Sequence, residues 1–274
     1  MSIKSQMTEK LLLLVLDGCR YDTAVEQMGI LNHHVDYKQA QLIKVHAEMP
    51  SSSRPLYEVL ATGVPSYRNG ILTNADGQHS KELSIFDLVK AAGGNTAAAA
   101  HYWQSELFNQ APYEIKLDRI QHDHKKSIQH GIFYSENQYP DSHVFADGHY
   151  LLHTYQPNLL LIHSMNIDTA GHRYTAVSKE YRKAVNQADQ LIGLYLHDWL
   201  AAGYQVIVTA DHGMDEYGLH GGSMAAHREV PLYIFSDIFP PDCGIEKMNQ
   251  LELAPLICSL LKIDTSERMQ IGRS

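Results

Sequence analysis

Short apolar runs alternate with amphipathic stretches along this chain of 274 residues. Four runs are apolar at nearly every position, without the polar alternation of a half-exposed strand. They span Leu11–Leu16, Asn158–Ile162, Gln205–Thr209 and Val230–Phe235. Continuous runs of this length are typical of strands in a sheet that is covered on both faces.

Helical spacing of apolar residues occurs between these runs. A long amphipathic helix is expected over Ser178–Gly203, where Tyr181, Val185 and Ala188 begin an apolar stripe. Shorter helices are expected over Ser53–Thr62, Ser84–Ala92 and Leu251–Leu261. Strands that alternate with helices indicate an α/β fold, with a mainly parallel central sheet and helices on both faces.

Residues 76–156 follow a different pattern. This stretch is rich in Tyr, His, Gln and Asn and lacks a clear rhythm of strands and helices. We predict that part of it forms a small cap or insertion. The remainder is expected to belong to one catalytic domain that covers residues 1–274, a length that suits a single large domain.

Composition and charge exclude several classes of protein. The net charge is −9 and no cluster of five basic residues occurs, so we expect no extended surface for nucleic acid or anionic membranes. The three cysteines form no CxxC pair, which argues against a disulfide framework and a structural zinc site. Leu11–Leu16 is too short for a signal peptide core or a membrane span. A soluble cytoplasmic protein is expected.

Carboxylates and imidazoles follow three of the four apolar runs, where ligands bind in open α/β sheets. The residues of interest are Asp17, Asp168, His172, Asp211, His212 and His220. A mixture of hard carboxylates and imidazoles suits zinc, manganese or iron better than calcium or magnesium. Two such ions about 4 Å apart polarise a phosphoryl group, activate a hydroxyl and neutralise a leaving oxygen.

Each of these segments also has an ordinary structural explanation. Asp17-Gly18 is a common turn, and Asp168 and His172 have the spacing of an ion pair on a helix. The serines of 51–53 suit a helix N-cap. Only their order and spacing, taken together, favour a site.

Several motifs occur in an order that resembles a known family. They are Pro50-Ser-Ser-Ser53, Thr62-Gly63, Asn69-Gly-Ile71, Asp168-Thr-Ala-Gly-His172-Arg-Tyr174, Asp211-His-Gly-Met214 and Gly218-Leu-His220-Gly-Gly222. These motifs resemble the alkaline phosphatase superfamily, within it the nucleotide pyrophosphatase/phosphodiesterases and the ethanolamine phosphate transferases. In those families a nucleophilic Ser or Thr lies nine residues before the Thr of Thr-Gly, which implies Ser53 rather than Ser51 or Ser52. Asn74 matches an Asn that contacts a phosphoryl oxygen.

The resemblance also implies two divalent metal ions, zinc first, with manganese or iron as alternatives. One ion would be held by Asp168, His172 and His220, and the other by Asp17, Asp211 and His212, with Ser53 at or between them. His227 resembles a histidine of the phosphopentomutase and phosphoglycerate mutase branch, and it competes with His220 for the first ion.

The expected activity is hydrolysis of a small phosphodiester or nucleotide pyrophosphate through a phosphoseryl intermediate on Ser53. A phosphomonoesterase and a mutase-like phosphotransferase are the alternatives. Arg54 either holds the extra charge of a monoester or is a surface residue, and the aromatic residues of 102–139 either stack on a leaving group or pack a cap. A sulfatase is disfavoured because Leu56 and Tyr57 follow Pro55, where its motif requires an arginine. The sequence carries no indication of oligomeric state.

Overall fold

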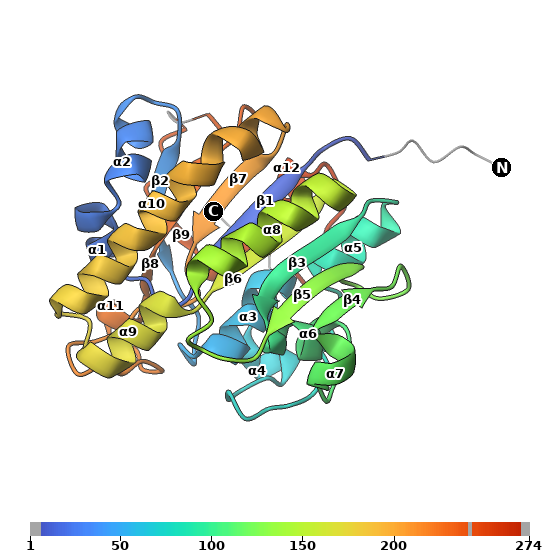
Figure 1. Cartoon of the computed structure of the whole chain (residues 1–274), viewed down its shortest axis with the longest axis horizontal. Coiled ribbons are helices and arrows are strands. Elements are labelled where there is room, and N and C mark those ends of the chain that lie inside the picture. Colours follow the sequence, from blue (N-terminus) through green and yellow to red (C-terminus); the bar gives the residue numbers. More distant parts are fainter. Residues whose placement is uncertain (1–6, 241–242, 270–274) are drawn as a thin grey trace.

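A nine-stranded sheet forms the centre of the molecule in the computed structural model, which describes residues 7–240 and 243–269 (Figure 1). Across the sheet the strands are β4 (Ile120–His122), β5 (His130–Tyr134), β3 (Thr96–His101), β6 (Leu159–Ser164), β1 (Leu11–Leu16), β7 (Gln205–Thr209), β8 (Glu229–Phe235), β2 (Gln41–His46) and β9 (Lys247–Asn249). β5, β3, β6, β1 and β7 are mutually parallel, whereas β8 is antiparallel to β7 and β2, and β4 is antiparallel to β5. The predicted mainly parallel α/β fold is therefore confirmed.

Helices cover both faces of the sheet. One layer contains α1 (Tyr21–Gln27), α2 (Gly29–Asp36), α8 (Asp141–Tyr155) and α10 (Lys179–Ala201), of which α8 and α10 cross the front in Figure 1. The other layer contains α3 (Ser53–Thr62), α5 (Ile85–Ala91) and α12 (Leu253–Leu260), which pack against one another. Adjacent residues of β6 contact opposite layers. Leu161 lies with residues of α3 and α5, whereas Ile162 lies against Gly148 of α8. This explains why the central strands are buried at nearly every position.

Short helices and turns cluster near the carboxyl ends of the parallel strands. They are α4 (Ser66–Asn69), α6 (Tyr102–Phe108), α7 (Ile115–Asp118), α9 (Asn166–Tyr174) and α11 (Ala225–Arg228), and a 3-10 turn, Gln250–Glu252, leads into α12. The expected helix Ser53–Thr62 has the bounds of α3, and Ser178 caps α10 by accepting a hydrogen bond from Tyr181 N at 3.1 Å. Across the ranges that the structure describes, no helix combines the length and the apolar character that a membrane crossing requires.

Residues 76–156 differ from the expected cap. This stretch supplies α5, β3, α6, α7, β4, β5 and α8, and its three strands belong to the same sheet as β1. β3 lies inside the sheet, although its sequence Thr-Ala-Ala-Ala-Ala-His reads as a helix. α8 packs across this strand and β6: a Cβ built on Gly148 would lie 2.4 Å from Ile162 Cδ1 of β6 and 3.8 Å from Ala99 Cβ of β3.

Candidate metal centre

The site lies where three neighbouring parallel strands end. Asp17 follows β1, Asp211 and His212 follow β7, and β6 leads into α9, which carries Asp168. Carboxyl ends of adjacent parallel strands meet at one edge of a sheet, so these side chains converge although they are far apart in sequence. Gly18 permits this approach, because it has a φ of +73° and a Cβ there would lie 2.9 Å from Asp168 Cα.

An inner group of side chains is almost completely buried. Asp17, Asp211 and His212 are 0% exposed, and Asp168 is 4% exposed. His212 Nε2 lies 3.5 Å from Asp17 Oδ1 and 3.4 Å from Asp211 Oδ2. Asp17, Asp168 and His212 each offer a ligand atom within 4.8 Å of the others, which is a suitable cluster for one cation.

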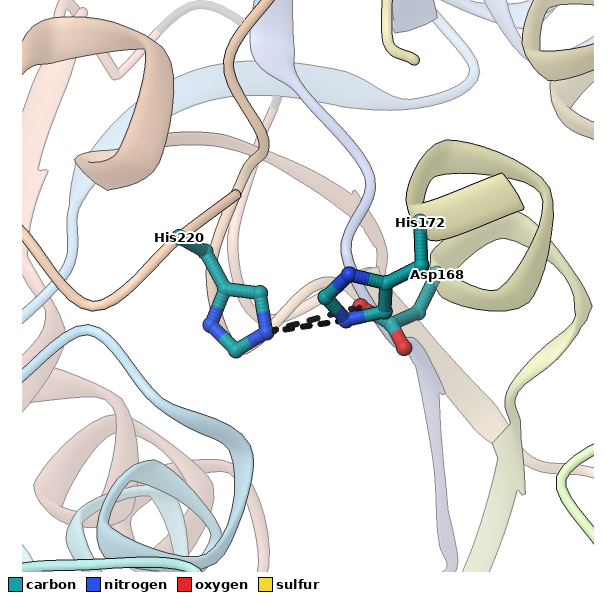
Figure 2. Close-up of side chains that lie close together, drawn as sticks. All are labelled: Asp168, His172 and His220. Atoms are coloured by element: carbon teal, nitrogen blue, oxygen red, sulfur yellow. Dashed lines mark hydrogen bonds and ion pairs between the residues drawn. The ribbon is translucent and has the colours of Figure 1, made fainter. Parts of the chain in front are cut away.

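An outer group consists of Asp168, which it shares with the inner group, and the histidines His172 and His220 (Figure 2). His172 Nε2 lies 3.4 Å from Asp168 Oδ1 and 3.2 Å from His220 Nε2, and His220 Nε2 lies 3.9 Å from the same carboxylate oxygen. The His172 side chain is 45% exposed, whereas the His220 side chain is 10% exposed. The two groups together provide donors for a pair of ions, one buried and one near the surface.

Backbone carbonyls orient the three imidazoles. The Nδ1 atoms of His172, His212 and His220 lie 2.8, 2.9 and 3.0 Å from the carbonyl oxygens of Gly218, Gly213 and Ser51, respectively. Nδ1–H therefore donates to each carbonyl, and Nε2 keeps its lone pair towards the centre, as in metal-binding histidines. Burial lowers the pKa of His212 and of His220 to about 3, so both rings are neutral at pH 7.

The carboxylates show that these residues fit divalent cations. Asp17 Oδ1, Asp168 Oδ1 and Asp211 Oδ2 are buried and have no hydrogen-bond partner among the described residues. Burial raises the pKa of all three carboxyls, and mutual repulsion raises the pKa of Asp17 and Asp168 further. Bound divalent cations would both occupy the unpaired oxygens and remove the repulsion.

Ser53 is the serine of the 51–53 run that reaches the inner group. Its hydroxyl lies 3.1 Å from His212 Nε2, at the amino end of α3. Ser51 instead donates to the Gly222 carbonyl at 2.6 Å, and Ser52 is the N-cap residue of α3. The dipole of α3 favours negative charge at its amino end and therefore at the Ser53 oxygen.

Asn74 lies beside the first turn of α3. Its Oδ1 accepts a hydrogen bond from Arg54 N at 3.0 Å. Because the backbone N–H can only donate, this contact assigns the oxygen of the amide, and Nδ2 remains a donor. The Nδ2 donor of Asn74 is therefore not used by this contact, one residue along α3 from Ser53.

The structure separates the two histidines that competed for the outer ion. His220 lies in the outer group, whereas both nitrogens of His227 are engaged elsewhere. His227 Nε2 lies 3.1 Å from Asp215 Oδ2, and its Nδ1 accepts from Gly222 N at 3.0 Å. The geometry favours His220.

The surface interpretation of Arg54 is wrong. Its side chain is 2% exposed, pairs with Glu106 through Nη1 at 2.8 Å, and lies 5.7 Å from the centre of the Trp103 ring. Glu106 is in turn fixed by Tyr113 N at 3.0 Å. Arg54 therefore belongs to a buried ion pair next to the candidate nucleophile.

Two residues at the site lack any sequence motif. Tyr57 OH donates to Asp17 Oδ2, and His163 Nε2 lies 3.3 Å from the same oxygen. The position of His163 in the apolar run before Asp168 was a usable signal, because it places this ring at the carboxyl end of β6. The sequence held no such signal for Tyr57, because its place in the helical pattern is equally typical of a residue that only packs in the core.

The fold and the site define a class. A parallel sheet whose strand ends bring carboxylates and imidazoles around one serine hydroxyl is an architecture of the alkaline phosphatase superfamily, which includes metal-dependent enzymes of phosphoryl transfer. The chain belongs to the type I phosphodiesterase / nucleotide pyrophosphatase family, whose model matches residues 11–224.

Similarity to individual proteins is distant. The chain is 22% identical over 233 residues to GPI ethanolamine phosphate transferase 2 of Eremothecium gossypii, and 23% identical over 279 residues to GPI ethanolamine phosphate transferase 3 of Schizosaccharomyces pombe. These alignments cover 83% and 92% of this chain but 28% of either transferase. The structure of murine ectonucleotide pyrophosphatase / phosphodiesterase 5 superposes with a TM-score of 0.76 at 14% identity, over 97% of this chain and 98% of that one. This likeness confirms the fold.

Proposed function

We propose that the protein hydrolyses phosphodiesters or nucleotide pyrophosphates, with Ser53 as nucleophile and two divalent cations. One observation carries the proposal: the Ser53 hydroxyl lies 3.1 Å from His212 Nε2, beside three buried carboxylate oxygens that lack partners among the described residues. The names of the structural relatives, which include a nucleotide pyrophosphatase / phosphodiesterase in complex with AMP, support the substrate class.

In this proposal Asp17, Asp211 and His212 hold the inner cation, and Asp168, His172 and His220 hold the outer one. Asp168 also lies within reach of Asp17 and His212, so it stands between the two positions. When bound, the cations lower the pKa of the serine hydroxyl and neutralise charge on the leaving oxygen. The most natural metal for this mixed donor set is zinc, with manganese or iron as alternatives.

The residues of the chain then act in two displacements. Ser53 Oγ forms a bond to phosphorus as the bond to the leaving oxygen breaks, and Asn74 Nδ2 donates to a non-bridging oxygen as charge builds. The Ser53 hydroxyl gives up its proton to solvent water as its bond to phosphorus forms, and the leaving oxygen takes a proton from water. A water molecule next attacks the phosphoserine, which releases the phosphoryl group and restores the serine hydroxyl.

Transfer to another hydroxyl is a second candidate, and the names of the ethanolamine phosphate transferases favour it. In that case an alcohol replaces water in the second displacement. The mutase alternative loses its supporting residue, because His227 contacts Asp215 and Gly222 rather than the outer group.

The test begins with metal analysis of the purified protein, followed by assays with bis-p-nitrophenyl phosphate and p-nitrophenyl phosphate. We expect about two zinc ions per chain and a preference for the diester. Ser53→Ala should abolish turnover and retain the metal, because Asp and His ligands remain. Ser52→Ala is the matched control and should keep full activity. Full activity in Ser53→Ala, or a preference for the monoester, would overturn the corresponding part of the proposal. A phosphorylated product formed with an added alcohol, such as glycerol or a sugar, would favour transfer over hydrolysis.

A further inference from the structure

The two carboxylate oxygens of Asp17 have different surroundings. Oδ2 is the acceptor for the Tyr57 hydroxyl and lies 3.3 Å from His163 Nε2. Oδ1 has no hydrogen-bond partner in the described part of the chain and lies 3.5 Å from His212 Nε2. A buried carboxylate with one oxygen held by two groups and the other unpaired is oriented, and the unpaired oxygen faces the candidate metal centre.

Tyr57 approaches Asp17 from the helix that carries the nucleophile. It lies four residues after Ser53 on α3, so both side chains project from the same face of the helix. The ring is 1% exposed, packs edge-on against His163 with centroids 4.6 Å apart, and has its hydroxyl 3.5 Å from Met165 Sδ. Its hydroxyl therefore has little freedom to leave Asp17.

His163 approaches the same oxygen from a neighbouring strand. It is paired with Val15 in the register of β6 and β1, which places it next to the end of the strand that leads to Asp17. Tyr134 OH lies 2.8 Å from the His163 carbonyl and 3.4 Å from His163 Nδ1. Because a carboxylate is the strongest acceptor near this ring, we assign the hydrogen to Nε2, which donates to Asp17.

We infer that Tyr57 and His163 are positioning residues that orient Asp17 to bind the inner cation through Oδ1 alone. Tyr57 thereby couples the position of this ligand to α3 and to the Ser53 hydroxyl. The inference rests on the proposed metal site, and it adds to that proposal which oxygen coordinates and which two side chains determine this. Partners of metal ligands typically contribute about 10- to 100-fold to metal affinity.

The experiment measures Zn²⁺ affinity of the full chain by competition with a chromophoric chelator. Tyr57→Phe removes one hydroxyl, and His163→Leu removes the ring donor. We expect each to weaken the tighter of the two zinc sites by about 10- to 100-fold. His163→Gln places an amide N–H near the position of Nε2 and should restore most of the lost affinity, which a purely structural role for the ring would not predict.

Tyr204→Phe is the matched control for the loss of a buried phenol. Tyr204 is 3% exposed and donates to the Pro157 carbonyl at 2.8 Å, away from Asp17. The Tyr204→Phe variant should therefore bind zinc with wild-type affinity. Wild-type affinity in both Tyr57→Phe and His163→Leu, or equal losses in His163→Leu and His163→Gln, would overturn the inference. If the wild-type chain itself binds no zinc, manganese or iron, the proposed function fails first. If the wild-type chain binds two ions and both variants bind zinc with wild-type affinity, only the positioning role is refuted.

Discussion

Asn74 offers a sharp test of the proposed chemistry because a substitution can separate the contact of its Oδ1 from the proposed role of its Nδ2. Oδ1 accepts from Arg54 N at 3.0 Å, and Arg54 lies in the first turn of α3, where backbone N–H groups have no helical acceptor. Nδ2 makes no hydrogen bond within the described ranges and is the proposed donor to the phosphoryl oxygen. Asn74→Asp keeps the acceptor and replaces the donor with a second carboxylate oxygen.

The magnitudes of the two effects differ. Loss of one donor to a developing oxyanion reduces kcat by about 100- to 1,000-fold, or roughly 3 to 4 kcal/mol. The added negative charge near the phosphoryl group strengthens this effect, so Asn74→Asp should lose at least about 100-fold in kcat/KM. Stability should not fall, because a carboxylate at the amino end of a helix is favourable by about 0.3 to 1 kcal/mol. Asn74→Ala loses both functions and should also lower Tm by about 2 to 4 °C for each kcal/mol lost.

The assay compares kcat/KM on bis-p-nitrophenyl phosphate with Tm and zinc content for the wild type and both variants. Asn74→Asp should be nearly inactive, fully metallated and as stable as the wild type. Asn74→Ala should be nearly inactive and less stable. If Asn74→Asp keeps kcat/KM within about threefold of the wild type, the amide does not contact the transition state and the assignment is refuted.

Two further predictions concern the outer metal site and a buried acid. His220→Ala should reduce the zinc content from two ions to one per chain, whereas His227→Ala should keep both ions and lose only stability. Mass spectrometric metal analysis of both variants checks this. The reverse pattern would assign the ligand to His227. Burial raises the pKa of the Glu58 carboxyl to about 8, so the folded protein favours its protonated form. Its contribution to stability is therefore complete below the unfolded pKa near 4.3 and is lost as pH rises towards 8, by at most about 5 kcal/mol. Urea unfolding at pH 5, 7 and 9 should show a weaker decline for Glu58→Gln than for the wild type, and parallel declines would contradict the prediction.

The parallel sheet was predictable because three of its central strands, β1, β6 and β7, are formed mostly by continuous apolar runs. Leu11–Leu16 is buried along its whole length, which follows from helices on both faces.

The structure of residues 76–156 was predictable only in part. β3 is built mostly from alanines, and its strand conformation depends on its pairing with β5 and β6 inside the sheet, which no local pattern records. Helix propensity and burial conflict there, and packing determines the outcome.

The candidate site followed from sequence where spacing and strand ends coincide. Asp17, Asp168 and Asp211 each follow a strand, and adjacent parallel strands bring them together without further information. Tyr57 and Arg54 could not be assigned in this way. Their roles depend on how α3 is oriented about its axis. Helical spacing alone does not distinguish the face of α3 that contacts Asp17 from the face that contacts Glu106.

The inner group also links metal binding to folding. Asp17, Asp168 and Asp211 are buried within one centre, and burial alone disfavours their ionised forms. Without cations, folding requires these carboxyls either to take up protons or to bear their mutual repulsion, and with cations the same charges become favourable. A ligand that binds only the folded chain stabilises it by about 2.7 kcal/mol at 100 times its Kd. The residues proposed to hold the cations are therefore the same residues whose burial would make the folded state depend on bound metal.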